Sequence, residues 1–244
     1  MSRNQIIFSI SCDPFDGVLF FKQTRLPFLA AREHPEQSRW VVADIAAYDA
    51  PRTVLEGLRS CGHCHTFSPD GRVFGMDVDR KGDKGGYFLA PVAPRMQLDG
   101  DHYITWNAFR PESAKPSMGL FTKISPCGRY LVSTVKETSL FAMLPDIWFS
   151  QLFFPIEGSL AVYDRDRRRF SNLPGADRSD VVQTCPEWHP DGQTVLFARA
   201  PVDAILVTLM KDKKYLTPAR GETGDPHANH FFDLQRPLRR GSFF

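Results

Sequence analysis

The segment 60–75, SCGHCHTFSPDGRVFG, holds the residues of this chain that are best suited to chemistry. Cys61, Cys64 and His65 have the spacing C-x-x-C-H. Two thiols three residues apart can form thioethers with the two vinyl groups of one porphyrin, and the imidazole that follows can ligate its iron. The spacing therefore predicts one covalent haem c, with Cys61 and Cys64 as its anchors and His65 as an axial ligand of the iron.

Three other interpretations of the motif stay open. Zinc could bind Cys61, Cys64 and either His63 or His65, but a closed structural site needs a fourth ligand, and no second C-x-x-C or H-x-x-x-H pair follows. A thioredoxin-like redox pair requires a helix in a βαβ setting, whereas this motif runs into a turn and a strand. The two cysteines could also have no chemical role.

The second axial ligand of a haem iron is not identified by the sequence. Met76 lies eleven positions after His65, on the strand that is expected to leave the turn. A five-coordinate iron would favour catalysis or ligand sensing over simple electron transfer. The other candidates are Met96, Met118, His102, His189, His227 and His230.

Other functional motifs are lacking. The acidic stretch 77–86 does not fit a calcium loop, because its twelfth position is Phe88 instead of a glutamate, so a strand that ends in a charged hairpin turn is expected there. The chain has no G-x-S-x-G, no G-x-x-x-x-G-K and no H-E-x-x-H. These absences favour an electron carrier or binding protein over an enzyme.

The elements that must position the motif are predicted to be strands. The 244 residues include 20 Phe, 19 Pro and 17 Gly, a composition typical of short strands joined by turns. Helical periodicity is nearly absent, apart from a short possibility at 34–38. Apolar and alternating runs predict strands at 18–21, 40–45, 73–78, 87–89, 130–135, 160–163, 195–198 and 204–209.

An internal repeat organises these strands. The turn Ser-Pro-Asp-Gly-Arg at 68–72 recurs as Ser-Pro-Cys-Gly-Arg at 125–129 and as His-Pro-Asp-Gly-Gln at 189–193. In each copy Pro presets φ and Gly takes a position that needs positive φ, so each copy predicts a hairpin. The copies lie 57 and 64 residues apart, more than the roughly 40–45 residues of compact propeller repeats, so long inserted loops are expected.

Partial repeats at 40–44, 160–165 and 231–236 resemble the strand that precedes a turn, and the last comes just before the sequence stops. They indicate fewer blades than a closed six-bladed ring, and hence an incomplete propeller. The most apolar segment, 140–156, contains two prolines and an aspartate, which exclude a membrane helix. It is expected to be an insertion packed on the core, or else a lid or a partner surface.

Charge and cysteine usage set further bounds. The formal net charge of +2 gives no support for nucleic acid as a partner, and five cysteines argue against a purely disulfide-stapled fold. Cys12, Cys127 and Cys185 are scattered and are expected to pack as small residues. No run approaches the roughly 20 apolar residues of a membrane span, and the stretch 6–12 is too short for a recognisable signal peptide.

The repeated hairpins resemble those of TolB-like β-propellers, a bacterial superfamily of exported or periplasmic proteins. CGHCHTFSPDGRVFGMDVDRKGDKGGYFL resembles a subgroup in which a C-x-x-C-H motif leads into the first propeller hairpin. SPCGRYLVSTVK, SQLFFPIEGSLAVYDR, LPGAD and PEWHPDGQTVLFARA fit the same subgroup, so the resemblance covers residues 20–240. It implies a propeller with a covalent haem held by Cys61 and Cys64 and ligated by His65.

The sequence thus predicts one all-β domain over residues 1–244, a TolB-like propeller of four-stranded blades that is truncated at both ends. The haem-attachment loop is expected at 60–66. The expected role is electron transfer or another redox role outside the cytoplasm, with redox or other proteins as partners. A protein-interaction scaffold without haem, with 140–156 as its docking surface, is the alternative, because a propeller fold by itself fixes no chemistry.

Overall fold

The computed structural model describes residues 17–25, 31, 34–58, 62–113, 115–142, 152–204, 207 and 231–232. Within them the chain is of the all-β class, with short 3₁₀ turns η1 (Pro35–Gln37), η2 (Gly100–His102) and η3 (Trp106–Ala108) and helical residues at Ala31, Ala204 and Val207. The strands are β1 (Val18–Gln23), β2 (Arg39–Asp44), β3 (Arg52–Glu56), β4 (Gly62–Phe67), β5 (Val73–Arg80), β6 (Asp83–Pro91), β7 (Tyr103–Thr105), β8 (Leu120–Ile124), β9 (Tyr130–Ala142), β10 (Leu152–Asp164), β11 (Arg169–Asn172), β12 (Val181–Trp188), β13 (Val195–Pro201) and β14 (Phe231–Phe232).

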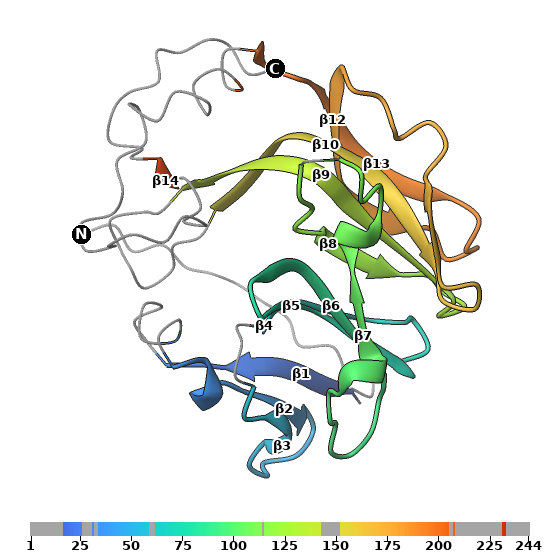
Figure 1. The fold of residues 1–244 in the computed structure, drawn as a ribbon. Coiled ribbons are helices and arrows are strands. Elements are labelled where there is room, and N and C mark those ends of the chain that lie inside the picture. Colours follow the sequence, from blue (N-terminus) through green and yellow to red (C-terminus); the bar gives the residue numbers. More distant parts are fainter. Residues whose placement is uncertain are drawn as a thin grey trace, which may run out of the picture.

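The described strands form four sheets that follow one another along the chain (Figure 1). Sheet I is β1-β2-β3, sheet II is β4-β5-β6-β7, sheet III contains β8-β9-β10-β11, and sheet IV is β12-β13. Neighbouring strands within each of these runs are antiparallel and consecutive in sequence. The short β14 adds to sheet III by pairing in parallel with the far end of β9.

The three repeated turns each connect the first two strands of a sheet, as the sequence predicts. They are 68–72 between β4 and β5, 125–129 between β8 and β9, and 189–193 between β12 and β13. In each turn the N–H of the glycine donates to the carbonyl of the first residue, at 2.8, 2.8 and 2.9 Å. The three glycines have φ of 69°, 70° and 68°, which explains why no other residue type takes this position in the repeat.

The sheets stack face to face, and a hydrophobic cluster fills each gap between successive sheets. Trp40 and Leu55 of sheet I meet Phe74 and Met76 of sheet II. A second cluster joins sheet II to sheet III, and a third joins sheet III to sheet IV. Sheets II and III are therefore each covered on both faces by a neighbouring sheet. The second cluster contains Tyr87, Leu89, Trp106, Phe109, Ile124, Leu131, Val135, Ala161 and Tyr163.

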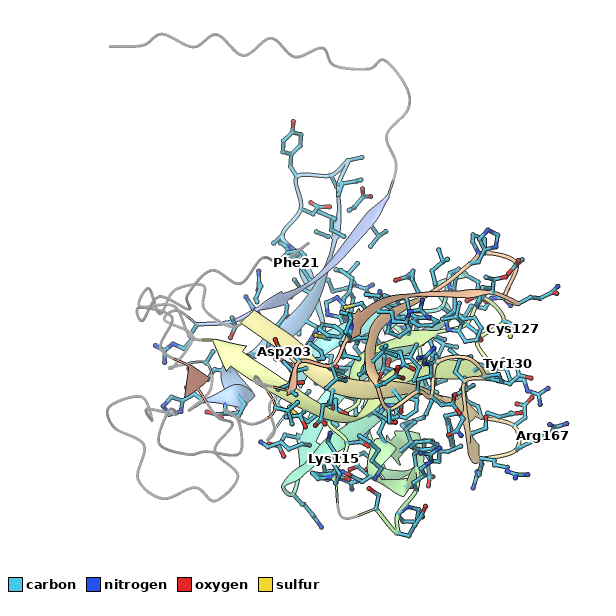
Figure 2. The ribbon with its side chains drawn as sticks, turned by 90° about the horizontal axis from the view of Figure 1, so that it is seen from above. Phe21, Lys115, Cys127, Tyr130, Arg167 and Asp203 are labelled. Atoms are coloured by element: carbon cyan, nitrogen blue, oxygen red, sulfur yellow. The ribbon has the colours of Figure 1, made fainter. Side chains whose placement is uncertain are left out.

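The first strands of three sheets lie side by side, since β8 contacts β4 in one direction and β12 in the other. The turns that follow them are also neighbours. A Cβ added to Gly128 would lie 3.5 Å from Val73, which follows the turn 68–72, and one added to Gly192 would lie 3.7 Å from Pro126 in the turn 125–129. Figure 2 shows Cys127, Tyr130 and Arg167 at one end of the molecule. The repeated turns thus gather at one end of the sheet stack.

Most predicted strands are confirmed, including the charged hairpin turn at Lys81–Gly82 between β5 and β6. The strand predicted at 204–209 is wrong in its described part. Ala204 and Val207 are helical, and the Val207 N–H donates to the carbonyl of Asp203 at 3.0 Å. A short apolar run carries the same signal in a strand and in a buried helix, so periodicity could not separate them.

Candidate functional site

The C-x-x-C-H motif leads into β4, the first strand of sheet II. Cys61 lies outside the described residues, whereas Cys64 and His65 lie within the strand. The attachment loop expected at 60–66 is therefore strand from residue 62 onward. These residues form a strand because the turn at 68–72 brings them next to β5, with which β4 pairs in antiparallel fashion.

A β-bulge interrupts β4 at the motif. Gly62 is paired with Val78 and His65 with Met76, so three steps along β4 match two steps along β5. The extra residue falls at positions 63–64. A bulge of this kind re-aims the side chains before and after it. It places Gly62 and His65 on the same face of sheet II, although three residues in a regular strand would place them on opposite faces.

His65 faces sheet I, within a group of aromatic rings. Its ring centroid lies 5.0 Å from that of Phe20 in an edge contact, 6.2 Å from Phe67, and 6.2 Å from Phe74 with near-parallel planes. Burial lowers the pKa of His65, and the positive charge of Lys22 lowers it further. The imidazole is therefore held largely neutral at pH 7 and behaves as a packing ring.

Cys64 faces the opposite way, toward sheet III. Desolvation by surrounding protein raises the pKa of its thiol, the carboxylate of Asp77 raises it further, and Lys123 on β8 opposes them. Cys64 in turn contributes to the raised pKa of Tyr87, a member of the cluster between sheets II and III. Part of Cys64 remains exposed to solvent, so a reactant can reach it.

These orientations decide how far the described residues fit a haem c. A haem anchored through Cys64 and ligated by His65 needs the thiol and the imidazole on the same porphyrin. In β4 the two side chains project from opposite faces of sheet II, as adjacent residues of an extended strand do. Cys64 is exposed to solvent, but His65 in this conformation faces sheet I and does not point to a porphyrin held by Cys64.

Among the other candidate ligands that the structure describes, Met76 lies beside the motif, because it is the register partner of His65 on β5. Among the residues that the structure describes, no three His, Cys, Asp or Glu side chains are grouped so that they could hold a metal ion. Met76 and Met96 are buried in the cluster between sheets I and II, and Met76 lies on the same face as His65. His102 and His189 pair with Asp99 and Asp191, and His227 and His230 lie outside the described residues.

Cys127 and Cys185 differ from the small packed residues that the sequence predicts, since both are exposed. Cys127 occupies the third position of the turn 125–129. A hydrogen bond with Ser125, 3.4 Å from its sulfur, lowers the pKa of Cys127. Cys185 lies in an irregularity of β12 with a φ of 51°. Cys12 lies outside the described residues.

A buried acidic pair, which the sequence analysis missed, lies between sheets II and III. Asp77 on β5 and Glu137 on β9 each have a buried carboxylate oxygen without a hydrogen-bond partner among the described residues. The other oxygen of Glu137 accepts the N–H groups of Met118 and Gly119, at 2.6 and 3.1 Å. Desolvation raises the pKa of Glu137 to about 7, and desolvation together with Glu137 raises that of Asp77 well above its usual range.

The alternation of side chains along β5 indicates the face of the sheet on which Asp77 lies. Phe74, Met76 and Val78 form one apolar face, so Gly75 and Asp77 must share the other. That other face is covered by sheet III, and sequence alone does not reveal a second covering sheet. The phenol oxygen of Tyr87 lies over Gly75 and is also buried, with no hydrogen-bond partner in the described part of the chain.

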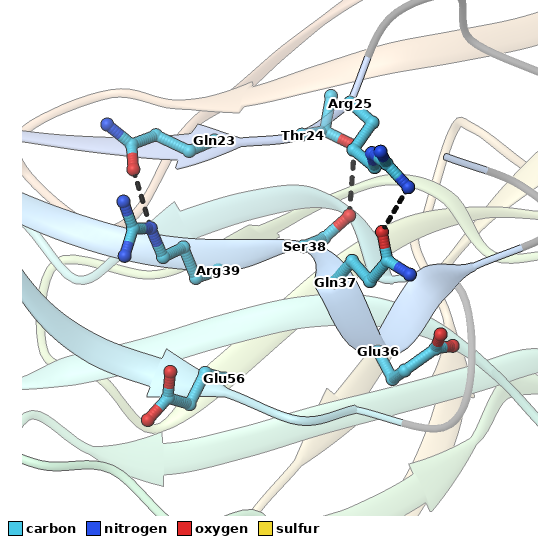
Figure 3. A pocket seen from close by; sticks show the side chains of 8 residues that line it. All are labelled: Gln23, Thr24, Arg25, Glu36, Gln37, Ser38, Arg39 and Glu56. Atoms are coloured by element: carbon cyan, nitrogen blue, oxygen red, sulfur yellow. Dashed lines mark hydrogen bonds between the residues drawn. The ribbon is translucent and has the colours of Figure 1, made fainter. Parts of the chain in front are cut away.

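A surface pocket lies at the ends of β1 and β3 and the start of β2 (Figure 3). Its volume of about 430 Å³ is within the range of small-molecule sites, but its lining is polar throughout, whereas ligand pockets are mostly apolar. Its side chains are tied to one another across the pocket by the pairs Arg39–Gln23, Thr24–Ser38 and Arg25–Gln37. These contacts hold the end of β1 against the start of β2, and they occupy polar groups that could otherwise bind a ligand in this pocket.

The apolar segment 140–156 lies only partly within the described residues. Its two ends, 140–142 and 152–156, extend the β9–β10 hairpin of sheet III. Pro155 lies next to a register irregularity in β10, where the missing N–H interrupts the ladder. The described ends are thus continuous strands, and residues 143–151, on which the choice between insertion and lid depends, lie outside the described part of the chain. No described helix is both long and apolar enough to cross a membrane.

Comparison with known proteins gives little further information. No family model matches the chain, and no curated protein matches its sequence. Among solved structures, the chain is similar to the tricorn protease, with 11% identity and a TM-score of 0.37 over 66% of this chain and 13% of that one. It is also similar to the hydrazine synthase of Kuenenia stuttgartiensis, with 15% identity and a TM-score of 0.38 over 70% and 48%. The chain spans less than half the length of either, and at these TM-scores neither likeness supports an argument.

Proposed function

We propose that this chain forms consecutive blades of a TolB-like β-propeller that carries one covalent haem c and has an electron-transfer or other redox role outside the cytoplasm. The propeller part is supported by the order of the sheets. Sheets II and III each contain a four-stranded antiparallel run in sequence order, and successive sheets stack face to face. Their first strands, with β12 of sheet IV, lie side by side, as strands around a common axis would.

One observation carries the haem part of the proposal. The turn is common to three hairpins, but Cys61 and Cys64 precede only the first of them. The turn is therefore scaffold, and the cysteines are the feature specific to this hairpin. Thioether formation adds each S–H across a vinyl double bond, so sulfur bonds to one carbon and the proton moves to the other, and no oxidant is required.

The zinc and redox alternatives have less support among the described residues. No three His, Cys, Asp or Glu side chains there are grouped so that they could hold a metal ion. The motif also leads into strand β4, whereas a thioredoxin-like redox pair begins a helix.

The experiment is expression of the chain with an export signal and a cytochrome c maturation system, followed by absorption spectroscopy and metal analysis of the purified protein. The proposal expects a haem c spectrum that survives acidic extraction of free haem, with one iron per chain. The matched variant Cys61→Ser/Cys64→Ser should lose it, whereas the control Cys127→Ser should keep it. A colourless wild type, or one that contains zinc instead of iron, would overturn the proposal.

A further inference from the structure

We infer that His65 is an aromatic packing residue that holds sheet I on sheet II, and that it is not the axial ligand of a haem anchored at Cys64. The first half depends on the structure alone. The second half rests on the proposed function, since it concerns the haem that the cysteines would hold.

The contacts of His65 come from both sheets. Phe20 belongs to β1 of sheet I, and Phe67 and Phe74 belong to β4 and β5 of sheet II. The three phenyl rings also pack on one another, with centroids 4.9 to 5.4 Å apart. His65 is the fourth ring of this group, and edge and offset contacts of this kind stabilise beyond the area they bury.

The backbone fixes the face on which His65 lies. Gly62 is held from sheet I, where Lys22 donates to its carbonyl at 2.8 Å, and a Cβ at Gly62 would meet Trp40 and Met76. At the other end, two hydrogen bonds close the turn 68–72. The Ser68 N–H donates to the carbonyl of Val73 at 2.9 Å, and the Val73 N–H donates to the Ser68 hydroxyl at 3.0 Å. β4 is therefore held at both ends.

Moving His65 to the face of Cys64 would require a one-residue slip of β4. Such a slip exchanges the faces of all the side chains that move with it. Phe67 would leave the aromatic group and the closed turn would lose its register with β5. The bulge at 63–64 accommodates the extra residue of β4 without such a slip, so His65 stays on the face of the aromatic rings.

The test uses the full chain, matured as above, with two substitutions of His65. His65→Phe keeps an aromatic ring of similar size but cannot ligate iron. His65→Gln keeps polarity but removes the ring. Each variant is measured by haem content, by resonance Raman or magnetic circular dichroism of the iron ligands, and by urea denaturation.

The inference expects His65→Phe to keep both the haem-ligand spectrum and the denaturation midpoint of the wild type, and His65→Gln to keep the spectrum but lower the midpoint. Loss of a histidine ligand in His65→Phe, restored by added imidazole, would overturn the inference while leaving covalent haem in place. If the wild type carries no haem, the proposed function fails, and the denaturation midpoints still decide the packing role. Equal midpoints for His65→Phe and His65→Gln would then overturn that role.

Discussion

Glu137→Gln tests whether a buried carboxyl group makes the stability of this fold depend on pH. Glu137 is only 6% exposed, and one of its oxygens has no hydrogen-bond partner among the described residues. The amide oxygen of glutamine can still accept the N–H groups of Met118 and Gly119, which the other carboxylate oxygen accepts now. The substitution therefore removes the titration while preserving the contact that anchors residues 118–119.

The sign and size of this pH dependence follow from the pKa of Glu137, which desolvation raises from 4.5 to about 7. The folded state binds this proton more tightly than the unfolded chain, so the contribution of Glu137 to the free energy of unfolding falls as pH rises from about 4.5 to about 7 and is constant above that. At about 1.4 kcal/mol for each pKa unit, the loss is on the order of 3 kcal/mol. Asp77, whose pKa is raised for the same reason, adds a loss of the same sign.

The assay is urea denaturation of the wild type, of Glu137→Gln and of Glu187→Gln, an exposed control, from about pH 5 to about pH 8. Comparing variants cancels the titrations that do not involve Glu137, including that of His65. Without the Glu137 charge the pKa of Asp77 is raised less, which changes the difference between the variants in the same direction. The difference between Glu137→Gln and the wild type should grow in favour of the variant by roughly 3 kcal/mol over this range, whereas Glu187→Gln should follow the wild type. A difference independent of pH would show that Glu137 is not a desolvated carboxyl and would refute the reasoning.

Two further predictions concern packing and thiol reactivity. Gly119→Ala should lower the free energy of unfolding by at least about 2 kcal/mol, because the new Cβ would lie 2.1 Å from Cδ1 of Trp106 at a φ of +71°. Gly100→Ala, with no atom within 4 Å of its Cβ, is the control and should be near neutral in the same denaturation assay; equal losses would contradict the packing argument. In the haem-free chain near neutral pH, iodoacetamide should modify Cys127 faster than Cys64, because the pKa of Cys127 is lowered and that of Cys64 is raised. Peptide mass spectrometry follows both sites, and faster modification of Cys64 would show that its thiol is not desolvated.

The local parts of the fold could be predicted because short-range sterics determine them. The Gly at the fourth position of each repeated turn needs positive φ, and that requirement is visible in the sequence. The charged turn at Lys81–Gly82 was predictable for the same reason. The strand predicted at 204–209 failed because an apolar run carries no information about which element buries it.

The candidate site was predictable in its residue types but not in its geometry. The spacing of Cys61, Cys64 and His65 predicts their chemistry, but the bulge at 63–64 arises from pairing with β5 and has no Gly or Pro signal at its own position. Burial of Asp77 and Glu137 could not be foreseen either, because it depends on sheet III covering the second face of sheet II. Both features are set by contacts between segments that are distant in sequence.

The most direct test of the central claim is the intact mass of the denatured, matured protein. Covalent haem at Cys61 and Cys64 predicts that the mass of the wild type exceeds that of the polypeptide by the mass of one haem. The variant Cys61→Ser/Cys64→Ser should have the mass of its polypeptide alone. A wild-type chain at the polypeptide mass after maturation, in a preparation where a known c-type cytochrome gains its haem, would contradict the claim.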